Sequence, residues 1–66
     1  MTGSELLAAI DTIGWSARML ASRCDVRQTT VQRWSHDQQR IPPPVAKWLH
    51  LLAAFHRSHP APIAPD

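Results

Sequence analysis

The side chains best suited to chemistry in this 66-residue sequence lie between residues 27 and 33. Helical spacing places five of them on one polar face, namely Arg27, Gln28, Thr29, Gln32 and Arg33. Amide and hydroxyl groups hydrogen-bond to base edges, and guanidinium groups bind both guanine and phosphate. The face contains no carboxylate, whereas a helix that is merely solvated usually includes glutamate. This composition therefore favours contact with a nucleic acid over ordinary solvation.

The elements that must position this face have the pattern of two short helices joined by a tight turn. Small or apolar side chains recur with the i, i+3, i+4, i+7 spacing at Ala17, Leu20, Ala21 and Cys24. This spacing predicts a helix over 16–24. Val31 and Trp34 continue it in a second helix over 28–35, and Asp25 between them tolerates a left-handed backbone. The layout is that of a helix-turn-helix unit.

Capping signals fix where the first two helices begin. Thr2 and Glu5 match a capping box, in which each side chain accepts a hydrogen bond from the backbone of the other residue. Gly14 is suited to a left-handed cap at the C-terminal end, so a first helix is predicted over 3–13. Ser16 is the expected N-terminal cap of the second helix.

Ile41 and a run of three prolines, Pro42 to Pro44, precede the most apolar segment, which predicts a fourth helix over 44–57. Its apolar residues form two adjacent stripes. The first contains Val45, Leu49 and Leu52, and the second contains Trp48, Leu51 and Phe55. One stripe closes the core, and the second is a candidate homodimer surface. An equally weighted alternative is that both stripes cover the first helix.

Charge is distributed unevenly along the chain. The formal net charge is +2, but all seven basic residues lie between residues 12 and 57 against only two acids, Asp25 and Asp37, for a local net charge of +5. A positive field favours polyanionic partners, although basic surfaces also serve solubility. The clustering of these charges around a helix-turn-helix pattern favours the partner interpretation.

Length and composition restrict the remaining classes. The sequence predicts one domain over residues 1–57 and a flexible, proline-rich tail over 58–66. Cys24 is the single cysteine, and His56 and His59 have no nearby cysteine or carboxylate pair, so we expect neither a metal nor another cofactor. We find no catalytic constellation and expect no enzyme. The absence of a signal peptide or an apolar membrane span predicts a cytoplasmic protein that does not contact a membrane.

With these residues identified, the chain resembles the lambda-repressor-like (Cro/C1-type) helix-turn-helix family of bacterial and phage regulators. The resemblance covers roughly residues 3 to 57, and its most specific parts are Trp15-Ser16, Leu20-Ala21, Val26, Thr30-Val31, Arg33-Trp34 and the proline-led helix from Pro42. It implies an all-α, compact four-helix domain, or five helices if a short turn is counted. It also implies a homodimer that binds an operator in double-stranded DNA and acts in transcription regulation, usually as a repressor.

The resemblance implies particular roles at matching positions. Gln28, Thr29, Gln32 and Arg33 are expected to contact base edges in the major groove. Ser16, Arg18, Arg27 and Arg40 are expected to contact DNA phosphates. Two positions depart from the family pattern, because many members have glutamine at the position of Ala17 and glycine at that of Asp25.

An alternative function uses the same fold to bind protein. In this hypothesis the chain is a helix-turn-helix interaction module, such as an antitoxin or adaptor. Its partner protein docks on the apolar face of the fourth helix, formed by Trp48, Leu51 and Phe55.

Overall fold

Four α-helices account for most of residues 1–62, the part of the chain that the computed structural model describes. They are α1 (Gly3–Ile13), α2 (Ala17–Cys24), α3 (Gln28–Ser35) and α4 (Pro43–Ser58). No strand occurs within these residues, so the predicted all-α, four-helix fold class is confirmed. The helix ends agree with the predicted ranges to within one residue.

Local side-chain bonds explain where α1 begins and ends. The Thr2 hydroxyl accepts from the Glu5 N–H at 3.2 Å, and the Glu5 carboxylate accepts from the Thr2 N–H at 3.0 Å, which completes the capping box. The Thr2 backbone bond is the main cause of a lowered pKa at Glu5, and the Thr2 side-chain bond adds to it. Gly14 ends the helix with φ of 86°, in the left-handed region that glycine enters at no steric cost.

The turn between α2 and α3 is three residues long, from Asp25 to Arg27. Ser16 caps the start of α2 by accepting from the Met19 N–H at 3.1 Å. Asp25 ends the helix with φ of 55°, and its N–H donates to the carbonyl oxygens of Ala21 and Ser22. The left-handed backbone predicted for Asp25 is thereby confirmed.

The proline run begins α4 one residue earlier than predicted. Pro42 is the N-terminal cap, and Pro43 and Pro44 both lie inside the first turn. The first four N–H groups of a helix have no intrahelical acceptor, so a missing proline N–H costs nothing at either position. Ile41, just before the run, is 6% exposed and belongs to the core, although the sequence pattern did not indicate it.

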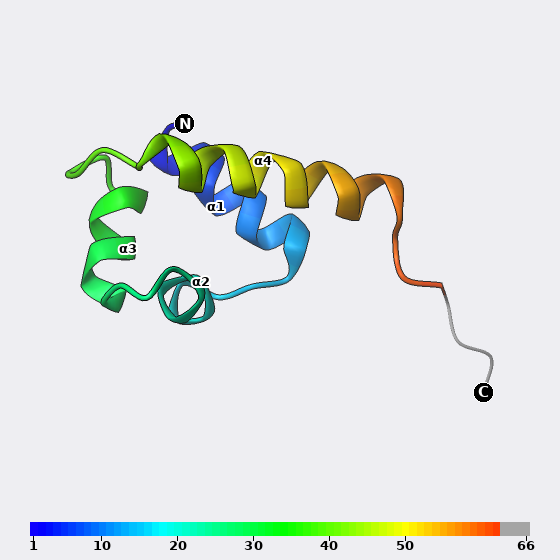
Figure 1. The fold of residues 1–66 in the computed structure, drawn as a ribbon, viewed down its shortest axis with the longest axis horizontal. Coiled ribbons are helices and arrows are strands. Elements are labelled where there is room, and N and C mark those ends of the chain that lie inside the picture. The colour runs from blue at the N-terminus through cyan, green and yellow to red at the C-terminus, as the bar shows by residue number, and fades with distance from the viewer. Residues whose placement is uncertain (63–66) are drawn as a thin grey trace.

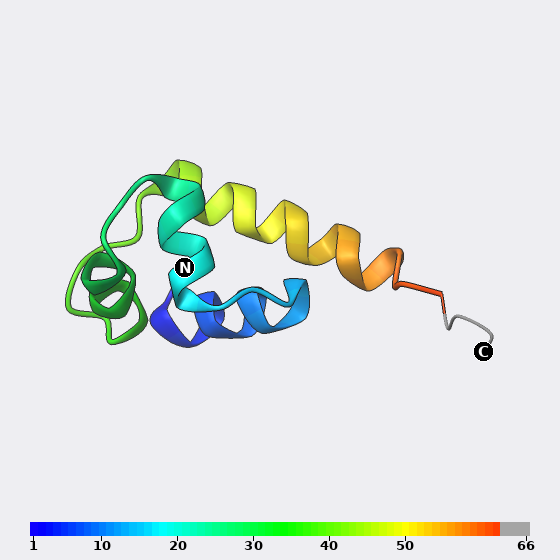
Figure 2. The ribbon, with the colours of Figure 1, turned by 90° about the horizontal axis from the view of Figure 1, so that it is seen from below.

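The core lies where the four helices meet. In Figure 1, α4 runs along α1, and α3 lies at one end of the pair. Figure 2 shows α2 across the seam between α1 and α4. The largest fully buried side chains come from all four helices and are Trp34, Leu6, Leu20, Leu49 and Val31. The core therefore ties α3, which has only eight residues and is unstable alone, to α1 and α2.

The chain leaves α4 after Ser58. The predicted flexible tail covers residues 58–66, of which 63–66 lie outside the described residues. Within residues 1–62, no helix combines the length and the apolar character needed to cross a membrane.

Candidate nucleic-acid interface

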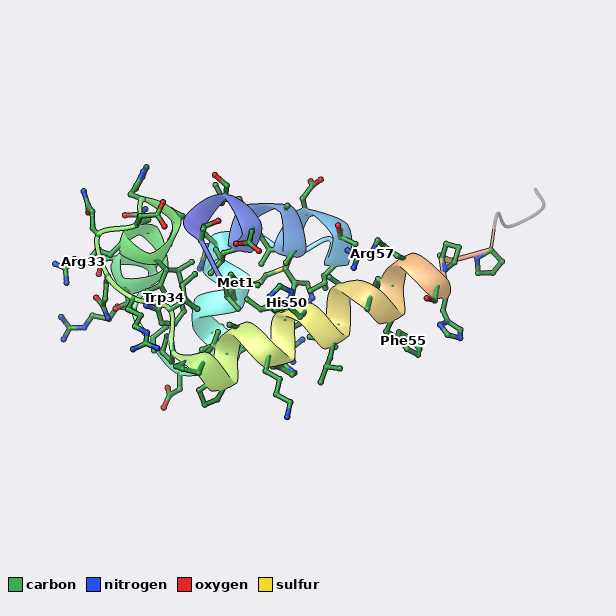
Figure 3. The ribbon with its side chains drawn as sticks, turned by 90° about the horizontal axis from the view of Figure 1, so that it is seen from above. Met1, Arg33, Trp34, His50, Phe55 and Arg57 are labelled. Carbon is green, nitrogen blue, oxygen red and sulfur yellow. The ribbon has the colours of Figure 1, made fainter. Side chains whose placement is uncertain are left out.

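The two faces of α3 differ completely in exposure. Val31 and Trp34 are 0% and 2% exposed, whereas the predicted base-contacting side chains are all exposed. Those side chains are Gln28, Thr29, Gln32 and Arg33. Figure 3 shows Arg33 extending away from the body of the protein while Trp34 lies within it. The structure thus brings all four predicted residues together on one solvent-facing surface.

The N-terminal end of α3 presents unpaired backbone donors. By helix geometry, the N–H groups of Gln28 and Thr29 have no intrahelical acceptor, and no side chain caps them. Arg27 occupies the cap position, and the first turn carries no acidic residue. The positive end of the helix dipole and an arginine therefore lie together at this end, an arrangement that attracts an anion.

The predicted phosphate-contacting residues lie on segments before and after α3 in the chain. Ser16 and Arg18 lie at the start of α2, Arg27 precedes α3, and Arg40 lies in the loop before α4. All four are exposed. The Ser16 oxygen accepts from Met19, which leaves its hydroxyl hydrogen available to donate.

Ala17 lies beside this set but turns partly inward. It is half-buried and packs against the core. The methyl group therefore acts as scaffold, and any anion contact at the start of α2 falls to Ser16, Arg18 and the backbone N–H groups.

A clamp between α1 and the end of α3 was not predicted from sequence. The Gly3 N–H donates to the Asp37 carboxylate at 2.8 Å, across 34 positions of sequence. A Cβ at Gly3 would overlap the backbone carbonyl of Ser35, so only glycine allows this close approach. Asp37 itself has φ of 57°. The sequence shows a glycine near the chain start and an aspartate in a polar loop. No local pattern predicts that the two residues are in contact.

Trp48 has a partner within the chain, which the stripe pattern did not reveal. Its ring lies 5.4 Å from that of Trp15, centroid to centroid, and the rings are tilted by 52°. The Arg23 guanidinium lies 5.6 Å from the Trp15 ring centroid, within cation–π range. Of the predicted dimer-surface residues, Trp48 is half-buried, whereas Leu51 and Phe55 are 62% and 58% exposed.

The histidines and Cys24 do not form a further site within the described residues. Among residues 1–62, no group of three or more His, Cys, Asp or Glu side chains is placed to hold a metal ion. His59 stacks on Phe55, with 4.4 Å between the ring centroids, and its Nδ1 lies 3.3 Å from the Phe55 carbonyl oxygen. Burial raises the pKa of the Cys24 thiol, which lowers its reactive thiolate fraction at neutral pH.

The arrangement is a small helical domain in which α3 presents an exposed polar face without a carboxylate. Comparison of the chain with protein-family models, with curated proteins and with solved structures yields no match.

Proposed function

We propose that this protein is a sequence-specific double-stranded DNA-binding regulator, acting in the cytoplasm as a repressor. The observation that carries the proposal is the exposed, carboxylate-free face of α3, held rigidly by two buried side chains on its opposite face. An α-helix with its side chains is about 10–12 Å across, and the major groove of B-DNA is about 12 Å wide. The exposed face of α3 is therefore narrow enough to enter the groove.

In this proposal Gln28 and Thr29 contact the first bases, because they open α3. Glutamine forms paired hydrogen bonds with adenine, and the threonine methyl group packs against the thymine methyl group. Gln32 lies one turn further along the same face, and Arg33 binds guanine or phosphate from the edge of that face.

The phosphate contacts are proposed to set the orientation of α3. Ser16 and Arg18 bind one strand beside the start of α2, while Arg27 and Arg40 bind near the two ends of α3. Such contacts carry no sequence information themselves. They fix which bases the exposed face of α3 meets.

The proposal includes a homodimer that binds a palindromic site through two copies of α3. Leu51 and Phe55 support this arrangement, because large apolar side chains on a small domain are costly to leave in water. The edge of Trp48 continues the same surface of α4.

Selection of preferred duplexes from a random pool tests the proposal. We expect a conserved half-site repeated with twofold symmetry. Arg18→Ala should weaken binding to selected and random duplexes alike and reduce the salt slope by about one unit. Arg57→Ala, at the far end of α4, is the matched control. It should leave the affinity for both kinds of duplex and the salt slope unchanged. Equal binding of selected and random duplexes at every salt concentration would contradict sequence-specific recognition.

The second candidate function is a protein-interaction module, such as an antitoxin or adaptor. The exposed Leu51 and Phe55 side chains favour it as well. It predicts a stable complex with a different protein that Arg27→Ala and Arg33→Ala leave intact and Leu51→Ser abolishes. Loss of this complex in Arg27→Ala and Arg33→Ala, but not in Leu51→Ser, would contradict a protein-binding function.

A further inference from the structure

A groove lies beside the first turns of α4, and Arg40 in the α3–α4 loop is the one lining residue that it shares with the proposed phosphate contacts. It has a volume of about 520 Å³, within the range of roughly 300–1,000 Å³ that is typical of ligand sites. Its walls come from the chain start, the α3–α4 loop and α4. In Figure 3, Met1 and His50, which both line it, lie close together on the side of the α1–α4 pair opposite to α2. We call this feature the α4 groove.

The lining of the α4 groove combines two kinds of side chain. Five lining residues are apolar, namely Met1, Ile41, Pro43, Ala46 and Leu51. Three are basic, namely Arg40, Lys47 and His50. None is acidic.

The basic side chains of the α4 groove form no side-chain hydrogen bond in the described part of the chain. None of the side-chain hydrogen bonds within residues 1–62 involves Arg40, Lys47 or His50. All three are exposed, and His50 acts electrostatically on the Glu5 carboxylate. The charges of Arg40 and Lys47 are therefore the ones available to an incoming group.

We propose that the α4 groove binds an acidic segment of a partner protein that inserts a large apolar side chain. The apolar side chain contacts Ile41 at the base and Leu51 on the wall, and neighbouring carboxylates pair with Lys47 and Arg40. Charge complementarity selects this occupant, because a groove that is basic at its rim and apolar within matches a segment with both properties.

The same charges oppose two other occupants. A second copy of this chain docked in the groove would bring its own Arg40 and Lys47 near these cations, and like charges repel. The proposed homodimer surface of Trp48, Leu51 and Phe55 shares only Leu51 with the groove. A DNA phosphate backbone would satisfy the cations but would gain nothing from five apolar lining residues. The proposal does not depend on DNA binding by α3.

Fluorescence anisotropy with a synthetic peptide tests the proposal on the full chain. The probe is a labelled, end-blocked dodecapeptide in which leucine and phenylalanine alternate with pairs of aspartates. One control peptide has serine in place of the apolar residues, and another has lysine in place of the aspartates. We expect saturable binding of the probe alone, weakening as salt is added because the rim charges are exposed.

Variants locate the binding site. Lys47→Ala should weaken binding about threefold, as expected for one exposed charge. Ala46→Asp, which puts a carboxylate in the groove outside the proposed dimer surface, should weaken it more. Arg57→Ala removes a cation from the same helix outside the groove and is the matched control. Circular dichroism confirms that each variant remains helical, and amide chemical shifts on adding the probe should move at Ala46, Lys47 and His50.

Three results would overturn the proposal. The first is absence of binding at millimolar peptide, and the second is equal binding of all three peptides. The third is a loss with Arg57→Ala as large as that with Lys47→Ala. Absence of peptide binding together with weaker duplex DNA binding in Lys47→Ala would assign the groove to phosphate instead.

Discussion

Val31 and Gln32 are adjacent in the chain, yet one side chain is fully buried and the other lies in water. The 100° rotation between neighbouring helical residues makes this possible on an element of only two turns. Substitutions on the two faces therefore have different effects. Changes at Val31 or Trp34 act on stability, whereas changes at Gln28 or Gln32 leave the core untouched and test the proposed DNA contacts directly.

Gln28→Ala should relax the base preference at one position of the selected duplex without changing stability. Loss of a paired contact with adenine removes about 1–3 kcal/mol of discrimination, or roughly 5- to 160-fold between the preferred and the wrong base. Competition binding against duplexes substituted at each position measures this effect. Gln39→Ala, a glutamine in the α3–α4 loop, is the control, and an equal loss of preference there would contradict the assignment.

The capping box at Glu5 makes a pH-dependent contribution to stability. The pKa of this carboxyl is lowered in the folded protein from its ordinary value of 4.5, first by the Thr2 backbone hydrogen bond. A lowered folded-state pKa means that the contribution is fully present above 4.5 and is lost as the pH falls through the folded-state value. Thermal unfolding should therefore show a higher Tm for the wild type than for Glu5→Gln at pH 7. The difference should shrink below pH 4.5, and a constant difference across that range would contradict the capping role.

At the scale of elements, the position of α3 depends on contacts at both of its ends. The turn after Asp25 fixes its start, and the clamp between Gly3 and Asp37 fixes the region just after its end. Neither anchor belongs to the exposed polar face of α3. The orientation of that face therefore depends on residues outside it.

Gly3→Ala tests the clamp. The added Cβ overlaps the Ser35 carbonyl, which is backbone, so α1 and α3 must separate. We expect a loss of about 1–3 kcal/mol in the free energy of unfolding, as for an overpacked core site. Urea denaturation measures it, with the exposed Ser4→Ala as the control in the same helix. A loss no larger than that of the control would show that the clamp does not constrain the fold.

The sequence predicts the elements of this fold better than it predicts their contacts. Thr2, Gly14 and Ser16 act on backbone groups within four positions, so their residue types alone predict the helix ends. The clamp between Gly3 and Asp37 instead joins positions 34 apart, and no local pattern encodes that pairing.

The candidate site on α3 was predictable because its residues, like the helix caps, are only a few positions apart in the sequence. The four base-contacting candidates share one face because helical periodicity places them there. The α4 groove was not predictable, because its residues meet only after the α3–α4 loop and α4 have packed beside Met1.

At the scale of the whole molecule, the exposed apolar residues of α4 predict self-association. Sedimentation equilibrium at micromolar concentration should show a dimer, and Leu51→Ser with Phe55→Ser should convert it to a monomer that remains helical. Leu7→Ser, which changes a 47% exposed leucine on α1, is the matched control. A wild-type monomer that binds DNA as one copy per site would count against the role assigned to α4.

The placement of the three tryptophans gives the protein two separate optical reporters. Trp34 lies on the buried face of α3, within the core. Its indole Nε1 has no hydrogen-bond partner in the described part of the chain. Trp15 and Trp48 form a tilted pair where the loop after α1 meets α4. Fluorescence from a Trp34-only protein would follow release of α3, while the Trp15–Trp48 pair would follow separation of α4 from the chain before α2. Comparing the two signals during denaturation would establish whether α3 detaches before the rest of the domain unfolds.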